Sequence, residues 1–133
     1  MEKTPVLRDK KTILIVDDDA TILDFVAECL AANYDVLTAR SGEEALQKSN
    51  DFKPEIDLLL SDLQMPGITG IDLASRITVR RPKLKVLLMS GFTGGMLVLN
   101  EGWHFLPKPF IPSQLRTLVA ALIAPREPRY KPA

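Results

Sequence analysis

The segment that decides the fold is Thr12–Leu30, with the sequence TILIVDDDATILDFVAECL. Its first five residues, Thr12 to Val16, form a continuous apolar, β-prone run. Such a run is typical of a strand in a sheet that is covered on both faces. Three aspartates, Asp17 to Asp19, end it. The apolar positions that follow have the spacing of one face of an amphipathic helix and are Ile22, Phe25, Val26, Cys29 and Leu30.

The same succession of strand and helix continues along the chain. Short β-prone runs predict four further strands, which are Tyr34–Ala39, Ile56–Ser61, Leu84–Met89 and His104–Leu106. Together with Thr12–Val16 this makes five strands, each followed by a helix. That alternation indicates an α/β domain with a doubly wound parallel sheet.

Sequence signals also place the remaining helices. Ser41 precedes Glu44 by three positions, a capping box that begins the second helix. The third is predicted from Ile71 to about Arg81, and a short fourth helix between Gly91 and Gly102. Pro112 lies near the start of the last helix, where proline is favoured. The apolar stripe of that helix is Leu115, Leu118, Val119, Leu122 and Ile123.

Composition is that of an ordinary globular domain. Of 133 residues, 46% are hydrophobic and 26% are charged, and the formal net charge is +0. A neutral chain has no overall field that attracts nucleic acid or an acidic membrane. The single cysteine, Cys29, forms no intrachain disulfide and is expected in the core. With no apolar run of membrane-spanning length and no signal peptide, we predict a cytoplasmic domain that binds neither membrane nor nucleic acid directly.

Polar residues follow the predicted strands at the edge where such folds bind ligands. Asp17, Asp62, Ser90 and Lys108 come at the ends of four different strands. Taken singly, an aspartate there is more often a helix cap, a serine a turn residue and a lysine a solvated side chain. Together they mark a site, because the carboxyl ends of parallel strands meet at one edge.

The charges at this edge predict a metal-assisted phosphoryl chemistry. Asp17, Asp18 and Asp62 would repel one another strongly when ionised, and Mg²⁺ (or Mn²⁺) is the hard cation that such oxygen ligands favour. A carboxylate beside the metal can attack a phosphoryl group and become an aspartyl phosphate. Lys108 and Ser90 would then supply a positive charge and a hydroxyl donor to the phosphoryl oxygens.

Four segments give the chain a family resemblance, and they are ILIVDDD (13–19), LLSDLQMPG (59–67), LLMSG (87–91) and FLPKPF (105–110). In these segments the sequence resembles the receiver domain of two-component response regulators. The resemblance covers about residues 12–124, flanked by a flexible N-terminus (1–11) and a Pro-rich tail or linker start (125–133). It implies a flavodoxin-like, three-layer (βα)5 sandwich with parallel strand order 2-1-3-4-5.

The resemblance also implies a role for each site residue. Asp62 corresponds to the phosphoacceptor. Asp17 and Asp18 correspond to the acidic pair that organises Mg²⁺, with Asp18 as the direct ligand. Gln64 would offer its backbone carbonyl to the metal, and Lys108 would bind the phosphoryl group.

A switch is implied as well. Ser90 corresponds to the switch hydroxyl and Phe105 to the aromatic switch residue, although Phe105 lacks the hydroxyl of a tyrosine. The bond between Lys108 and Pro109 is commonly cis in this family. Two residues would have opposite effects on hydrolysis: Phe92 would cover the phosphoryl group and exclude water, whereas Gln64 would position an attacking water. We expect the shielding by Phe92 to dominate and the phosphoprotein to decay slowly.

The implied partners are those of a signalling module. A histidine kinase or histidine phosphotransfer protein would donate the phosphoryl group. A downstream protein or output domain would contact the face formed by the fourth helix, fifth strand and fifth helix. The stretch from Ser90 to Lys108 is shorter than is usual in the family, so the fourth helix is expected to be short or irregular. The chain is either a stand-alone receiver or part of a larger regulator or hybrid kinase.

Two other readings of the first strand end compete with this one. The pattern of Asp17 and Asp19 also resembles a haloacid-dehalogenase-like phosphatase, with Asp17 as nucleophile and Asp19 as acid/base. That class needs a second acidic cluster after the lysine, but Glu127 is the only acid downstream of Lys108. A dinucleotide-binding domain would need a glycine-rich turn where the aspartates stand. The phosphatase reading also leaves Asp62 unexplained, and in the dinucleotide-binding reading the aspartates would repel phosphate without a cation.

Overall fold

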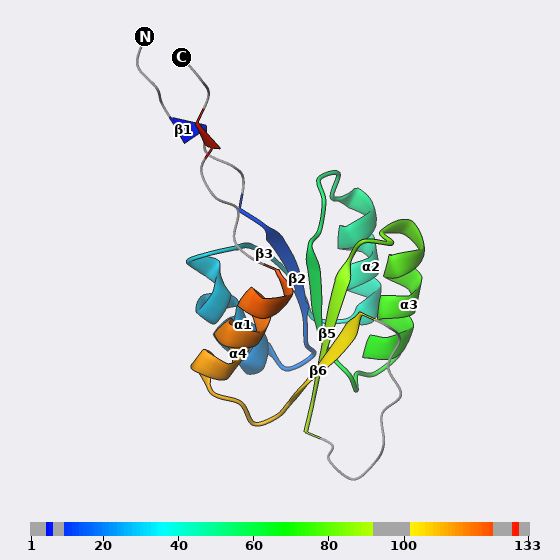
Figure 1. The fold of residues 1–133 in the computed structure, drawn as a ribbon. Helices are drawn as coiled ribbons and strands as arrows, with labels where there is room; N and C mark the ends of the chain where they lie inside the picture. Colours follow the sequence, from blue (N-terminus) through cyan, green and yellow to red (C-terminus); the bar gives the residue numbers. More distant parts are fainter. Residues whose placement is uncertain (1–4, 7–9, 92–101, 124–128, 131–133) are drawn as a thin grey trace.

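The fold is a central parallel sheet with helices on both faces (Figure 1). The computed structural model describes residues 5–6, 10–91, 102–123 and 129–130. The sheet strands are β2 (Thr12–Val16), β3 (Asp35–Ala39), β4 (Leu58–Asp62), β5 (Lys85–Ser90) and β6 (Trp103–Pro107). They pair in the order β3-β2-β4-β5-β6, and all four pairings are parallel. Counted along the chain, β2 to β6 are the first to fifth strands of this sheet, so the observed order is 2-1-3-4-5. Both the predicted fold class and the predicted strand order are therefore confirmed.

Four helices are present among the described residues, and they are α1 (Ala20–Ala31), α2 (Gly42–Asp51), α3 (Gly70–Arg80) and α4 (Pro112–Leu122). Helices α1 and α4 cover one face of the sheet, and α2 and α3 cover the other (Figure 1). Their bounds agree with the predicted ones to within a few residues. The short helix predicted between Gly91 and Gly102 falls in residues 92–101, outside the described part of the chain. None of the helices described is long and apolar enough to cross a membrane.

The alternation of side chains along each strand divides the core into two layers. Ile13 and Ile15 of β2 pack with α1 and α4, whereas Leu14 and Val16 pack with α2 and α3. All four side chains are fully buried. Burial on both faces explains why the central strands are apolar throughout instead of alternating with polar residues.

Helix α1 is rotated relative to the predicted apolar stripe. Its buried positions are Leu23, Val26 and Leu30, and Phe25 is 41% exposed. The stripe prediction was therefore wrong for Phe25, and it omitted Leu23. The helix places Phe25 on its flank, where its ring lies 6.5 Å from that of Phe110 in the loop after β6. Cys29 is partly buried against the core, as expected.

Short polar side chains start three of the helices. Asp19, Ser41 and Thr69 each accept a backbone N–H from the first turn of α1, α2 and α3, respectively. Ser41 Oγ accepts from Glu44 N at 3.0 Å, as the capping box predicts. The return bond goes one residue further than that motif requires, from Arg40 N to Glu44 Oε1 at 2.8 Å.

The described segments near the two ends of the chain lie side by side. Strand β1 (Pro5–Val6) pairs antiparallel with β7 (Arg129–Tyr130), away from the central sheet (Figure 1). The sequence did not predict this pair. A flexible N-terminus and a Pro-rich linker are not tested by it and stay predictions.

The connection from β4 to α3 brings two backbones into close contact. Gly67 adopts a φ of +78°, which favours glycine. At Gly70, the first residue of α3, an added Cβ would lie 2.3 Å from the carbonyl oxygen of Asp62 and 3.0 Å from Leu63 Cα. Gly70 N also donates to Leu63 O at 2.9 Å. The absence of a side chain at Gly70 thus lets α3 begin directly against the end of β4.

We expect Gly70→Ala to destabilise the protein by about 1–3 kcal/mol, the usual cost of overpacking a tight contact. The added methyl group meets backbone atoms, which cannot move aside as a flexible side chain can. Gly91→Ala is the matched control, because no atom of the described residues lies within 4 Å of a Cβ built there. Urea unfolding of both variants measures the difference. Equal midpoints for the two would contradict the close approach.

Candidate phosphoryl-transfer site

The predicted site residues converge at the carboxyl edge of the sheet. Asp17 directly follows β2, Asp62 and Ser90 end β4 and β5, and Lys108 directly follows β6. The parallel register places these ends level, with Val16 opposite Ser61, Asp62 opposite Met89 and Ser90 opposite Pro107. Four separate segments of the chain thus deliver two carboxylates, a hydroxyl and an amine to one place.

Three carboxylates form a compact acidic cluster. One oxygen from each of Asp17, Asp18 and Asp62 lies within 4.8 Å of the other two. Asp17 is buried, with 1% of its surface exposed, and Asp62 is 9% exposed, whereas Asp18 lies at the surface. Two of the carboxylates are therefore shielded from bulk water, and the third borders it.

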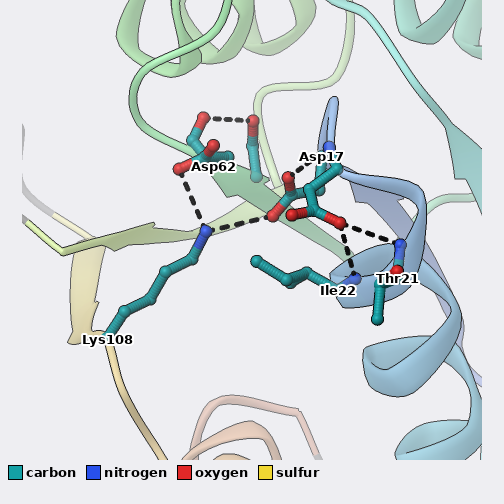
Figure 2. A network of polar contacts seen from close by, with 7 residues as sticks. Asp17, Thr21, Ile22, Asp62 and Lys108 are labelled. Atoms are coloured by element: carbon teal, nitrogen blue, oxygen red, sulfur yellow. Dashed lines mark hydrogen bonds and ion pairs between the residues drawn. The ribbon is translucent and has the colours of Figure 1, made fainter.

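Lys108 bridges the two buried carboxylates (Figure 2). Its Nζ lies 3.1 Å from Asp17 Oδ2 and 3.4 Å from Asp62 Oδ1. Its side chain is only 19% exposed, so solvent screens these ion pairs weakly. Its backbone N–H donates to Ser90 O at 2.8 Å, which fixes the start of the lysine relative to β5. The bond from Lys108 to Pro109 is cis, as the resemblance implied.

The turn after β2 fixes Asp17 and Asp19 in different roles. Asp17 Oδ1 accepts from Asp19 N at 2.9 Å, while its Oδ2 contacts Lys108. The carboxylate of Asp19 accepts from Thr21 N at 2.9 Å and Ile22 N at 3.3 Å, and so caps α1 (Figure 2). A buried Asp17 engaged through both oxygens and a capping Asp19 do not suit the nucleophile and the acid/base of a phosphatase.

The electrostatic environment of Asp62 favours its neutral form. Burial raises the pKa of this carboxyl above its ordinary value, and repulsion from Asp17 raises it further. The neighbouring ammonium group of Lys108 offsets part of the rise, and Asp18 adds a smaller repulsion. Without a further cation, the ionised carboxylates repel one another in a poorly solvated site. An additional positive charge bound among them would relieve this electrostatic strain.

The remaining predicted residues occupy different positions around the cluster. Ser90 is 2% exposed at the end of β5. Gln64 lies at the surface, two residues beyond Asp62. Phe105 is partly buried on β6, packed against the core on the α2–α3 side. His104 is half-buried on the same edge strand. Phe92 lies outside the described residues.

Sequence reasoning missed residues that position the site without belonging to it. Gly70 is one of them, because its close approach to the Asp62 carbonyl sets how near α3 lies to the end of β4. Asp57, buried at the opposite edge, accepts from Thr12 N at 2.8 Å and joins the starts of β2 and β4. A glycine directly after the capping Thr69 was a usable signal for the first. For Asp57 no local pattern distinguishes a buried acceptor from a surface carboxylate.

The family comparison agrees with this geometry. The model of the response regulator receiver domain matches residues 13–120. The chain belongs to this family of two-component receiver domains, a signalling module with a phosphoacceptor site and not a classical enzyme. It is similar to the receiver domain of the hybrid histidine kinase CckA, with 34% identity and a TM-score of 0.75 over 84% of this chain and 98% of that one.

Three further relatives include one structure solved with a metal and two full-length proteins. The response regulator TrrA of Thermotoga maritima, solved in complex with Mg(2+)-BeF, is 30% identical, with a TM-score of 0.73 over 85% of this chain and 99% of that one. The regulator PhoP of Bacillus subtilis is 31% identical over 85% of this chain and 48% of its own. The sensor kinase CckA of Brucella abortus is 32% identical over 92% of this chain and 14% of its own. The chain thus spans half or less of these two full-length relatives.

The strained carboxylate predicts an unusual pH dependence of stability in metal-free buffer. Because the folded-state pKa of Asp62 is raised, its ionisation costs stability as pH rises through that pKa, and the cost is absent below the ordinary value of 3.8. Asp62→Asn removes the ionisation. We expect this variant to melt a few degrees higher than the wild type at pH 7 in EDTA.

The difference in melting temperature between Asp62→Asn and the wild type should shrink as the pH is lowered toward 3.8 and vanish below it. Lys108 keeps a partner in the variant, since Asp17 remains at 3.1 Å. Asp24→Asn, which removes an exposed carboxylate of α1 outside the cluster, is the control and should shift the melting temperature little. Thermal melts from pH 3 to 8 test both. A less stable Asp62→Asn variant at pH 7 would contradict the strain.

Proposed function

We propose that Asp62 is the phosphoacceptor of this receiver domain. The observation that carries the proposal is the lysine bridge: Lys108 holds Asp62 beside Asp17 at the end of β4, with one Asp62 oxygen 3.4 Å from a fixed positive charge. In the transfer, an Asp62 oxygen attacks phosphorus and forms an O–P bond. The bond from phosphorus to its donor breaks, and the donor leaves with the electron pair. Lys108 stabilises the charge on the transferring phosphoryl oxygens.

Asp17, Asp18 and Asp62 would hold a Mg²⁺ ion, with Gln64 contributing its backbone carbonyl. The three clustered carboxylates and the raised pKa of Asp62 support this assignment. When bound, the ion would neutralise the carboxylates and the incoming phosphoryl group. Asp18 is the exposed member of the cluster and is the ligand that solvent reaches most easily.

Ser90 and Phe105 would connect the site to the signalling surface. Ser90 lies at the carboxyl edge with Asp62, and Phe105 lies on the neighbouring edge strand β6. A phosphoryl group on Asp62 would attract the Ser90 hydroxyl, and Phe105 would repack behind it. This is a population shift between two packings, driven by contacts that only the phosphorylated state makes.

The partners follow from this role. A histidine kinase or histidine phosphotransfer protein would supply the phosphoryl group. A downstream protein or output domain would bind the face that includes β6 and α4. We keep residues 12–124 as the receiver unit. Self-catalysed hydrolysis of the aspartyl phosphate, slowed by Phe92 and modestly assisted by Gln64, belongs to the same proposal.

Incubation with acetyl phosphate and Mg²⁺, followed by intact-mass measurement, tests the phosphoacceptor. We expect a single phosphoryl adduct on the wild type and none on Asp62→Asn. Reduction of the acyl phosphate with borohydride, followed by peptide mapping, locates it. The control is Asp19→Asn, which keeps a good helix cap and should still be phosphorylated. An adduct located on Asp17 would instead favour the phosphatase.

The metal site predicts a ligand-dependent rise in stability. An ion that binds only the folded chain raises the free energy of unfolding by mass action, by about 2.7 kcal/mol at a hundredfold excess over Kd, and so raises the melting temperature. Asp18→Ala should abolish the shift that MgCl₂ produces, while Asp24→Ala, on the exposed side of α1, should retain it. Melting curves with MgCl₂ and with EDTA measure both. A full shift in Asp18→Ala would place the ion elsewhere.

A further inference from the structure

A cavity of about 450 Å³ lies beside the phosphoacceptor site. It is formed between α1 and the loop that joins β6 to α4, and the described residues that line it are Ile22, Phe25, Gly91, Lys108, Pro109 and Phe110. This volume is in the range of small-molecule binding sites, about 300–1,000 Å³. The cavity is therefore large enough for a small ligand next to the reacting carboxylate.

Lys108 connects the cavity to the site. Its side chain forms part of the cavity wall, while its Nζ contacts Asp17 and Asp62. From the other side, Ile22 points from α1 toward Lys108 (Figure 2). Gly91, which also lines the cavity, directly follows Ser90. A ligand held in the cavity would thus have one end at the lysine that binds the phosphoryl group.

The described lining of the cavity is apolar except for one charged side chain. Among the described residues that form it, Lys108 alone carries a charge, and two are aromatic. Phe25 is 41% exposed, which is unusual for a ring on the flank of a core helix, and its ring lies 6.5 Å from that of Phe110, tilted by 36°. Two rings and an isoleucine next to one ammonium group complement a molecule with an anionic head and a flat apolar body.

We propose that this cavity is a subsite for the leaving group of small phosphoryl donors and that it selects aromatic acyl phosphates over acetyl phosphate. The proposal rests on Asp62 being the phosphoacceptor. An Asp62 oxygen attacks phosphorus, the bond between phosphorus and the bridging oxygen breaks, and the aromatic carboxylate leaves with the electron pair. Asp62 attacks as the carboxylate and the aromatic acid departs as its carboxylate, so the step needs no proton transfer.

The selectivity arises from apolar contact. The phenyl ring of benzoyl phosphate can contact Phe25, Phe110 and Ile22, whereas the methyl group of acetyl phosphate is too small to reach across the cavity. Partial burial of the ring is expected to raise the second-order rate constant by about tenfold, which corresponds to about 1.4 kcal/mol. Because the ring stays in contact from the bound state to the transition state, the gain should appear in kcat/KM.

The experiment compares benzoyl phosphate with acetyl phosphate as donors to the full chain in MgCl₂, with the adduct on Asp62 measured by mass. The ratio of the two rate constants in the wild type is divided by the same ratio in Phe25→Ala, so that the intrinsic reactivities of the donors cancel. We expect a quotient of about ten. Val79→Ala is the matched control. Val79 is 81% exposed on α3, at the opposite face of the sheet. The wild-type ratio divided by the ratio in Val79→Ala should therefore be one.

A second measurement needs no variant. Phenylphosphonate should inhibit labelling by acetyl phosphate at lower concentration than methylphosphonate, because only the former fills the cavity. Phe25→Leu, which restores an apolar wall, should recover part of the benzoyl phosphate preference. A quotient near one, with equal inhibition by the two phosphonates, would overturn the subsite and leave the phosphoacceptor intact. Failure of both donors to label Asp62 would overturn the phosphoacceptor and, with it, the subsite.

Discussion

Repulsion between two buried carboxylates is the constraint around which the carboxyl edge of the sheet is organised. Asp17 and Asp62 stand at the ends of adjacent strands, and Lys108 lies within 3.4 Å of both. Removing one partner of a buried ion pair typically costs about 3–5 kcal/mol, because the remaining charge is left without compensation. The lysine must therefore come from a part of the chain that the fold brings back to this edge. Strand β6, at the far side of the sheet, provides it.

The register of the sheet makes this compensation possible. Asp62 and Met89 are partners across β4 and β5, and Ser90 is the partner of Pro107, the residue before Lys108. A slip of one residue in either pairing would turn the side chains to the opposite face and separate the charges. The two-layered apolar core fixes that register, since the central strands β2, β4 and β5 bury both faces. The precision of the site is thus a consequence of core packing.

Much of this arrangement was predictable from local patterns. Apolar runs that end in Asp17, Asp62 and Ser90 identify the strands, and strand ends of a parallel sheet must meet. The orientation of α1 was not predictable in the same way. The periodicity around Phe25 fits two overlapping stripes, and only the position of α1 against the sheet and α4 selects the one containing Leu23. Arg81 was missed for a similar reason.

The guanidinium group of Arg81 donates to the carbonyl oxygens of Ser49, Phe52 and Pro54, all distant in sequence. No spacing rule links an arginine at the end of one helix to carbonyls in and just after the last turn of another, so tertiary contact alone defines its role. The proposed leaving-group subsite depends on such a contact as well. Phe25 and Phe110 meet only because α1 and the loop after β6 lie together, and the side chain of Lys108 lines the same cavity. Methylenes of that side chain are apolar while its ammonium group is charged. On our proposal, one side chain would thus contact the leaving group along its length and the phosphoryl group at its tip, which ties donor selection to the same residue that balances the two carboxylates.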